Sequence, residues 1–267
     1  MKASVIISVY KNVNALRFVL DSLRCQTEKD FEIIISEDGN SDIMFDFVRN
    51  YDWFCQYQHI TQEDLGWRKN RALNRAIVKA RAEMLIFLDG DCIVHRRFVE
   101  MHLFYAKPNH VLVGKRVKLS EKLTLKLFDG DIKFKALGRE MWKRLLFRQE
   151  CRFTDEGIFI PLCLSKPLRG AKMLKGCNMS LPKEAILAIN GFNEDYKLPS
   201  IGEDEDIDWR LRAIGCQFVS VRNRAIVYHL YHKSNWDSND RNKNLVIMEE
   251  EKISNRIICN NGINNHI

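Results

Sequence analysis

The sequence lacks several features, and each absence excludes a class of protein. Its longest apolar stretches, such as residues 84–88, have the length of a strand, so none could span a membrane as a helix. The apolar run near the N-terminus is interrupted at Tyr10, too early for a signal peptide, and we therefore expect a cytoplasmic protein. The eight cysteines occur singly, without a Cys-x-x-Cys pair, which excludes the usual zinc-site spacing and favours free thiols in a reducing compartment.

Positive charge is concentrated in one part of the chain. Residues 115–150 hold eleven Lys or Arg and only five acidic residues. From residue 118 to residue 153 apolar residues recur at helical spacing, and Trp142 and Phe147 lie among the basic residues. We interpret 118–153 as a basic helical insert. Two roles stay open for it: its apolar stripe packs on the rest of the domain, or residues 118–150 rest on an anionic membrane at its inner face.

An apolar run from Met84 to Leu88 is followed directly by Asp89-Gly90-Asp91. Such a run is typical of a buried strand in a parallel sheet, and open α/β sheets bind ligands at the carboxyl ends of their strands. Two carboxylates at this position are costly to bury without a cation, and oxygen ligands suit Mg²⁺ or Mn²⁺, which also bind substrate phosphates. The pair therefore predicts a metal site for a phosphorylated substrate, with a solvated Asp-Gly turn as the alternative.

Strand-like and helix-like segments alternate through the first 117 residues. We expect strands at 3–10, 31–36, 54–60, 84–88 and 111–117, with helices at 14–23, 43–48, 69–82 and 97–106 between them. This alternation predicts a doubly wound α/β fold, with a Rossmann-like, mostly parallel central sheet flanked by helices. Farther along we expect a strand at 218–228, a helix at 240–258 and a frayed tail at 260–267.

Acidic residues and histidines form two further groups. Gly202 is followed by four consecutive acids, 203–206, which repel one another and must therefore be solvated, metal-bound or catalytic. Acids are also common at helix N-termini, where they favour the helix dipole, but this explains one or two of the four. A short amphipathic helix follows them, so Glu203 and Asp204 would lie at its first turn. His229 and His232 come at the end of the last expected strand, where a histidine could complete a metal shell begun by Asp91. Spacing alone does not separate the two histidines; we favour His229, which directly ends the strand.

Together these motifs resemble the family 2 glycosyltransferases of the GT-A fold. The opening strand, with Ser8 and Tyr10, is similar to the family's nucleotide-binding turn. Residues 37–42 resemble its acidic turn, which places Asp38 at the uracil and ribose. Residues 66–74 are similar to its Arg-Asn helix start, which implies that Arg68 and Arg71 approach the nucleotide diphosphate, where helix N-termini and guanidinium groups suit phosphate.

The second half resembles the galactosyltransferase-like region of the family. The resemblance is carried by residues 176–180, 190–194, 202–204 and 209–211, in this order along the chain. It implies that Asp204 is the catalytic base and that Glu203 contacts the acceptor. It also implies that Asp91, supported by Asp89, and His229 hold Mn²⁺ or Mg²⁺.

The resemblance implies an inverting, metal-dependent transferase that moves a hexose or N-acetylhexosamine from a UDP-sugar to a glycan or lipid-linked glycan. The expected process is the synthesis of surface polysaccharide or lipopolysaccharide. On this interpretation 1–117 is the nucleotide-sugar-binding half, 118–153 the insert, 154–239 the acceptor-binding and catalytic half, and 240–267 a C-terminal helix and tail of one GT-A domain.

Two other classes of protein are weighed against this interpretation. A haloacid-dehalogenase-type phosphatase also carries Asp-x-Asp after an apolar strand and would use Asp89 as its nucleophile. In such enzymes that strand is normally the first of the fold, whereas here it is about the fourth. A basic protein that binds a membrane or nucleic acid without catalysis would explain the charge at 115–150. No nucleic-acid-binding motif is present, so nucleic acid is not an expected partner.

Overall fold

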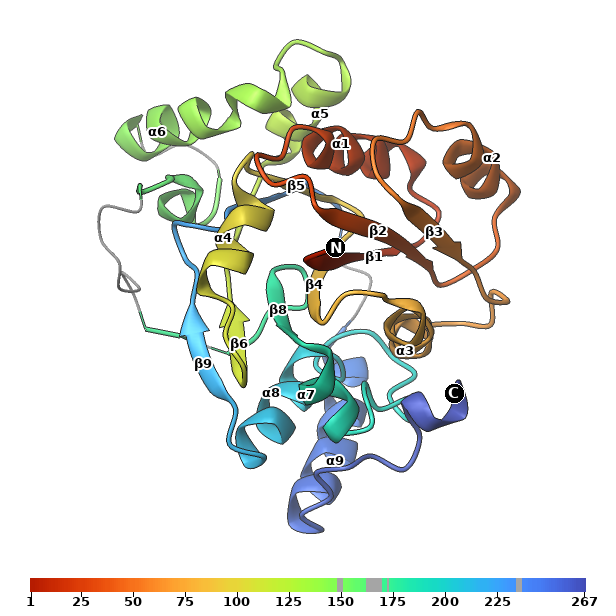
Figure 1. The fold of residues 1–267 in the computed structure, drawn as a ribbon. Helices are drawn as coiled ribbons and strands as arrows, with labels where there is room; N and C mark the ends of the chain where they lie inside the picture. Colours follow the sequence, from red (N-terminus) through yellow and green to blue (C-terminus); the bar gives the residue numbers. More distant parts are fainter. Residues whose placement is uncertain (148–150, 162–169, 172, 234–236) are drawn as a thin grey trace.

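The central sheet of the computed structural model has seven strands in the order β3-β2-β1-β4-β8-β6-β9 (Figure 1). The structure describes residues 1–147, 151–161, 170–171, 173–233 and 237–267. The strands are β1 (Ala3–Val9), β2 (Phe31–Glu37), β3 (Tyr57–Ile60), β4 (Met84–Asp89), β6 (His110–Val113), β8 (Met179–Pro182) and β9 (Gln217–Ser220). Strands β1 to β4 are parallel, whereas β8 runs antiparallel to both of its neighbours. The predicted mostly parallel sheet is confirmed.

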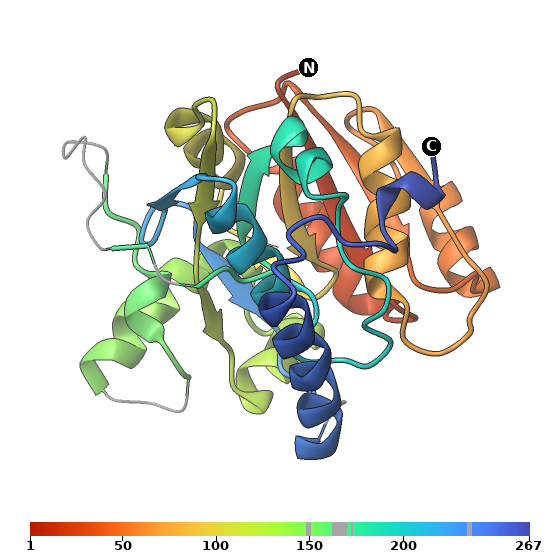
Figure 2. The same ribbon diagram turned by 90° about the horizontal axis from the view of Figure 1, so that it is seen from below.

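Alternate residues of the central strands enter two separate cores. Val5 and Ile7 of β1 pack under α1 (Val13–Arg24), α2 (Asp42–Asn50) and α4 (Phe98–Tyr105). Ile6 points to the opposite face, which is covered by α3 (Lys69–Lys79), α7 (Lys183–Ala188) and α8 (Asp204–Ala213). Figure 2 shows helices on both sides of the sheet. Because both faces are covered, these strands are continuous apolar runs.

A second, three-stranded sheet has the order β5-β10-β7, from β5 (Cys92–Val94), β10 (Val227–His229) and β7 (Arg116–Lys118). The chain leaves the central sheet three times to form it, after β4, β6 and β9. The strand expected at 111–117 is two strands in different sheets, because the chain turns at Gly114, whose N–H donates to the Asn178 carbonyl at 2.9 Å. The strand expected at 218–228 is divided in the same way into β9 and β10.

The basic segment forms α5 (Glu121–Phe128), the short 3₁₀ helix η1 (Phe134–Ala136) and α6 (Leu137–Phe147). Leu123 and Leu127 of α5 and Leu137 and Met141 of α6 are buried in one cluster with residues of the three-stranded sheet. The inner faces of both helices therefore pack on the domain. Arg148 and Glu150, which were counted among the charges of this segment, lie outside the described residues. The division of the chain into 1–117, 118–153, 154–239 and 240–267 stays a prediction.

The C-terminal region differs from the expected frayed end. Helix α9 spans Ser238–Ile253 and so ends five residues earlier than predicted. The tail beyond it is packed: Cys259 and Ile263 are buried, the Asn264 N–H donates to the Asn190 side-chain oxygen at 2.9 Å, and Ile263–Asn265 forms the 3₁₀ helix η3. In both views the C-terminus lies beside α3 (Figures 1 and 2).

Other predictions are corrected in detail. The strand expected at 54–60 is limited to Tyr57–Ile60, and the short strands β5 and β8 and the 3₁₀ helix η2 (Thr154–Gly157) are not apparent in the sequence pattern. Seven described cysteines are free thiols, as predicted, and Cys163 lies outside the described residues. Among the described residues, no helix combines the length and the apolar character needed to cross a bilayer.

Candidate active site

The turn at Gly90 positions the two carboxylates predicted to bind a metal. Its N–H donates to the Ser8 carbonyl at 2.8 Å, which holds the turn against the end of β1. A Cβ at this position would lie 2.7 Å from the Val9 side chain, closer than real contacts allow. Only glycine therefore lets β4 end in this turn, with Asp89 as its last strand residue and Asp91 just beyond it.

Asp89 belongs to a cluster of charges that joins distant parts of the chain. One of its oxygens accepts from the Ser8 hydroxyl at 2.9 Å and from the Lys69 ammonium at 2.8 Å. Lys69, the first residue of α3, also lies 2.7 Å from the Glu203 carboxylate. Burial alone would raise the pKa of Asp89, but the Lys69 ammonium outweighs it and holds this pKa well below its usual range. Asp89 is therefore an anion fixed by a cation from α3.

Glu203 is held deep in the same cluster. It is 8% exposed, and a Cβ at position 176 would overlap its carboxylate, so Gly176 provides the space that it occupies. Burial raises the pKa of Glu203 to about 7, with the charges of Asp89 and Asp204 adding to the effect and Lys69 opposing it. This carboxyl group therefore takes up a proton more readily than an ordinary glutamate does.

Asp204 lies beside Glu203 in the first turn of α8. Its carboxylate contacts the Lys175 ammonium at 3.3 Å and accepts from the Gly176 N–H at 3.4 Å. Both partners precede β8 in the chain. The two candidate catalytic acids thus lie side by side at the start of one helix, Asp204 held by residues 175–176 and Glu203 by Lys69.

Asp91 has different partners from Asp89. Its carboxylate lies 3.6 Å from the His229 Nε2 atom and 3.2 Å from the His232 Nε2 atom. The ligand atoms of the three residues lie within 4.8 Å of one another, as one ion requires. His232 therefore joins His229, whereas the Asp89 carboxylate is engaged by Lys69 and Ser8.

The chemistry of this group fits a divalent metal ion. Burial lowers the pKa of His229, with Asp91 opposing the effect, and so favours the neutral imidazole that a metal requires. Imidazole nitrogens are ligands of first-row transition metals, and carboxylates bind Mn²⁺ and Mg²⁺ alike. The set therefore has the chemistry of a site for a divalent cation, Mn²⁺ or Mg²⁺.

The five residues predicted to bind the nucleotide have different surroundings in the structure. Tyr10 lies exposed at the end of β1, and Ser8 is bound to Asp89. Asp38 is buried, and its two oxygens accept from the Gln62 side chain at 2.8 Å and from the Arg68 backbone N–H at 2.7 Å, so it fixes the start of α3. The Arg68 side chain donates to the Glu63 carbonyl, and Arg71 lies 3.9 Å from Glu194. Their roles in binding nucleotide stay predictions.

Lys69 was missed by the sequence analysis, although it lies between Arg68 and Arg71. Residues 69 and 71 are separated by about 200° around a helix, so their side chains leave α3 on opposite sides. Of the basic residues at 68, 69 and 71, Lys69 is the one that contacts both Asp89 and Glu203. The sequence shows three basic residues at the start of this helix, but nothing in it indicates which of the three contacts the acidic residues.

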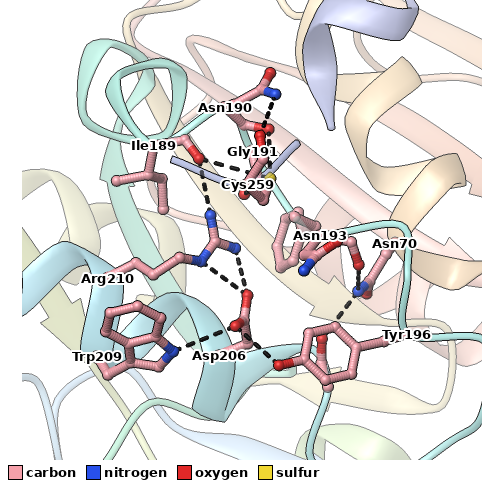
Figure 3. A network of polar contacts seen from close by, with 12 residues as sticks. Asn70, Ile189, Asn190, Gly191, Asn193, Tyr196, Asp206, Trp209, Arg210 and Cys259 are labelled. Carbon is pink, nitrogen blue, oxygen red and sulfur yellow. Dashed lines mark hydrogen bonds and ion pairs between the residues drawn. The ribbon is translucent and has the colours of Figure 1, made fainter. Parts of the chain in front are cut away.

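Asp206 has a structural role, which cannot be recognised from its place in a run of four acids. Its carboxylate pairs with the Arg210 guanidinium, whose Nε atom donates to it at 2.9 Å, and it also accepts from Tyr196 and Trp209 (Figure 3). Arg210 donates in turn to the Ile189 carbonyl at 2.8 Å. The four acids therefore do not share one role, because Asp206 is buried in an ion pair that anchors α8.

Comparisons with known proteins decide the family. Residues 4–158, more than half of the chain, match the family described as glycosyl transferase family 2. The chain belongs to glycosyl transferase family 2. Residues 164–233 also match the family described as the N-terminal domain of galactosyltransferase. The predicted resemblance is confirmed in both halves, and the phosphatase and the non-catalytic binding protein are not supported.

Two similar proteins have names that describe the transfer or polymerisation of sugars. The chain is 29% identical over 231 residues to validoxylamine A glucosyltransferase of Streptomyces hygroscopicus subsp. jinggangensis, covering 82% of this chain and 53% of that protein. It is 25% identical over 263 residues to chondroitin synthase of Escherichia coli, covering 91% of this chain and 37% of that protein. The chain thus spans about half or less of the length of these two relatives.

A solved structure of GalNAc-T7 with UDP, GalNAc and Mn²⁺ superimposes with a TM-score of 0.63 and 14% identity. The match covers 94% of this chain and 48% of that one. At this identity the likeness shows the fold alone, and the predicted GT-A architecture is confirmed.

Replacing Lys69 tests whether the charge cluster depends on it. We expect Lys69→Met to lower the free energy of unfolding by about 2–4 kcal/mol at pH 8, because it removes the ammonium group shared by the half-buried Asp89 carboxylate and the buried Glu203 carboxylate. Without that cation burial raises the pKa of both groups, so the folded variant gains stability as the pH falls and loses it as the pH rises.

Thermal unfolding measured from pH 8 to pH 5 checks this expectation. The difference in Tm between the wild type and the variant should be largest at pH 8 and should narrow toward pH 5. Lys79→Met, an exposed position in the last turn of the same helix, is the matched control and should change little. An equal Tm difference at both pH values would contradict the role given to Lys69.

Proposed function

We propose that this chain transfers a hexose or N-acetylhexosamine from a UDP-sugar to a glycan acceptor, with inversion at the sugar carbon. The proposal rests on two distinct groups of side chains at one edge of the sheet. Asp91, His229 and His232 form a set with the chemistry of a metal site, and Glu203 and Asp204 form a pair of acids at the start of α8. Transfer from a nucleotide sugar needs both, one for the leaving group and one for the acceptor.

Asp91, His229 and His232 are the residues that would hold Mn²⁺ or Mg²⁺. The ion would offset the negative charge that develops on the departing nucleoside diphosphate. Asp89 stays bound to Lys69 and Ser8 in the structure, so its part is to fix the end of β4 and to keep Lys69 in place. Ser8, Tyr10 and Asp38 are proposed to face the nucleotide.

Asp204 is the proposed base that takes the proton from the attacking acceptor hydroxyl. Its carboxylate contacts the Lys175 ammonium at 3.3 Å, which holds it in place at the first turn of α8. One base with direct attack on the sugar carbon gives inversion of configuration. Glu203, fixed by Lys69, is proposed to contact the acceptor beside it.

UDP is the proposed donor nucleotide, with support from the solved structure of GalNAc-T7 that contains UDP and Mn²⁺. Support for a glycan acceptor comes from the names of the relatives, a chondroitin synthase among them. We propose that the product belongs to a surface polysaccharide or lipopolysaccharide.

Asp204→Asn tests the base. We expect at least a hundredfold loss of sugar transfer with nearly unchanged binding of UDP in the presence of Mn²⁺, because the amide cannot accept the proton while the donor contacts remain. Transfer is measured as UDP release in the presence of acceptor, and binding by calorimetry. Glu205→Gln, at the next position of the same turn, is the control and should keep most of the activity. Equal loss of UDP binding and transfer would contradict the assignment of Asp204.

Peripheral contact with an anionic membrane is proposed for the outer face of α6. Trp142, Leu146 and Phe147 are 52%, 72% and 70% exposed, although each is a large apolar side chain. Arg139 and Lys143 of the same helix are also exposed. Apolar side chains next to basic ones fit the interface of a bilayer with anionic head groups, where a lipid-linked acceptor would be found. Helix α6 lies at the end of the molecule opposite the C-terminus (Figures 1 and 2).

Sedimentation with liposomes tests this contact. We expect the protein to bind vesicles that contain phosphatidylglycerol and to stay in solution with pure phosphatidylcholine. The double variant Leu146→Ser with Phe147→Ser should bind at least fivefold more weakly, because it removes apolar area from the interface. Ile253→Ser is the control, since Ile253 is 86% exposed at the end of α9. Equal binding by both variants, or no binding to anionic vesicles by the wild type, would contradict the proposal.

A further inference from the structure

Strand β7 places two positively charged side chains beside a candidate metal ligand. In the register of the three-stranded sheet, Lys118 of β7 lies next to His229 of β10. On its other side Lys118 lies directly opposite Arg152, and the two residues exchange both backbone hydrogen bonds at 3.0 Å. Paired residues of neighbouring strands project from the same face, and such strands lie about 5 Å apart. His229, Lys118 and Arg152 therefore form a row on one face, which we call the cationic row.

This face of β7 is turned toward the candidate active site. Arg116, two residues before Lys118 and therefore on the same face, has its Nη1 atom 3.9 Å from the Asp89 carboxylate. The opposite face carries Val117, which is buried in one cluster with Met141 of α6. Lys118 and the residue opposite it at 152 are both exposed. Their charged groups are therefore accessible to a ligand that enters the site.

The two cations of the row have no acidic partner in the part of the chain that the structure describes. Neither Lys118 nor Arg152 forms an ion pair there. Burial lowers the pKa of Lys118, and the like charges of Arg116 and Arg152 lower it further, with Cys177 opposing them. Like charges directly opposite each other on neighbouring strands are destabilising, and proteins retain such conflicts at functional sites. The pair therefore indicates that an anion binds here.

The row lies on the side of the candidate metal site that is away from the nucleotide. Ser8 and Asp38, proposed to face the nucleotide, belong to β1 and to the end of β2, which lie on one side of β4 (Figure 1). Strand β7 follows β6, which lies on the other side of β4, beyond β8. The Lys175 ammonium, whose charge also lowers the pKa of Lys118, lies 3.3 Å from the proposed base Asp204. The row is therefore placed where an acceptor, rather than the nucleotide, would lie.

We propose that Lys118 and Arg152 bind an oxyanion of the acceptor, either a phosphate of a lipid-linked glycan or the carboxylate of a uronic acid. The Arg152 guanidinium offers paired N–H donors to either group, and the Lys118 ammonium adds a point charge. A neutral acceptor leaves both cations unpaired, so the row selects acidic acceptors. That the oxyanion belongs to the acceptor rests on the proposed function; the binding of an anionic sugar by the row does not.

The side-chain Nε–Hε resonance of Arg152 in ¹⁵N-labelled protein tests the proposal directly, and Arg152→Lys assigns it. UDP and Mg²⁺ are added first, so that the donor site is filled. The probes are methyl glucuronide, the methyl phosphodiester of glucose 1-phosphate, methyl glucoside and inorganic phosphate, at constant ionic strength. The signal should move with at least one anionic sugar and stay in place with the neutral glucoside. A response to the glucuronide alone identifies the carboxylate as the source, and a response to the phosphodiester alone identifies the phosphate.

Lys118→Gln should weaken this binding about tenfold, the effect of losing one charge-assisted contact. Lys126→Gln, at an exposed position of α5, is the matched control and should leave the binding unchanged. The Tm of Lys118→Gln should equal or exceed that of the wild type, because the variant removes repulsion between like charges. A lower Tm would show that Lys118 serves the fold and would contradict the proposal.

Three results of the titration would overturn the proposal. They are no movement with either anionic sugar, movement with inorganic phosphate alone, and a response to the anionic sugars that UDP abolishes, since the row then belongs to the donor site. Failure of the transferase proposal is seen separately, as the absence of any change in the spectrum when UDP and Mg²⁺ are added.

Discussion

The ammonium group of Lys69 lies between two carboxylates from different halves of the chain, and the candidate site depends on this contact. Asp89 ends β4 and is fixed to β1 through Ser8, whereas Glu203 precedes α8 in the region related to galactosyltransferases. Two buried carboxylates near each other would repel and would favour protonation. With a cation from α3 between them, Asp89 stays ionised and the start of α8 is held at the edge of the sheet.

Glycine and buried ion pairs provide the rest of the positioning. Gly90 lets β4 turn against β1, and Gly176 leaves room for the Glu203 carboxylate. Asp206 and Arg210 fix α8 to the chain near Ile189, so the acids at its first turn start from a rigid helix. The C-terminal tail packs beside α3, where it is held by hydrogen bonds to Asn190.

Much of this arrangement could be predicted from the sequence, and the failures have physical causes. The apolar run at 84–88 and the alternation of strands and helices are strong signals, because burial on two faces requires them. Asp91 and His229 could be predicted as candidate metal ligands, because each lies at or just after the end of an expected strand. His232 and Lys69 could not be selected, because their roles depend on contacts between distant segments. Strands β5 and β8 are too short to show a periodic pattern of apolar residues. The burial of the tail depends on contacts with Asn190, which lies more than sixty residues away in the sequence.

The central claim is that the chain binds UDP through a metal site formed by Asp91, His229 and His232. Thermal unfolding with UDP, GDP and ADP, each with and without Mn²⁺, tests it most directly, since a ligand that binds only the folded state raises the Tm. We expect UDP to raise the Tm of the wild type only when Mn²⁺ is present, and to have no such effect on Asp91→Asn. No rise with any nucleotide in well-folded protein would contradict the claim, as would an equal rise with UDP when Mn²⁺ is absent.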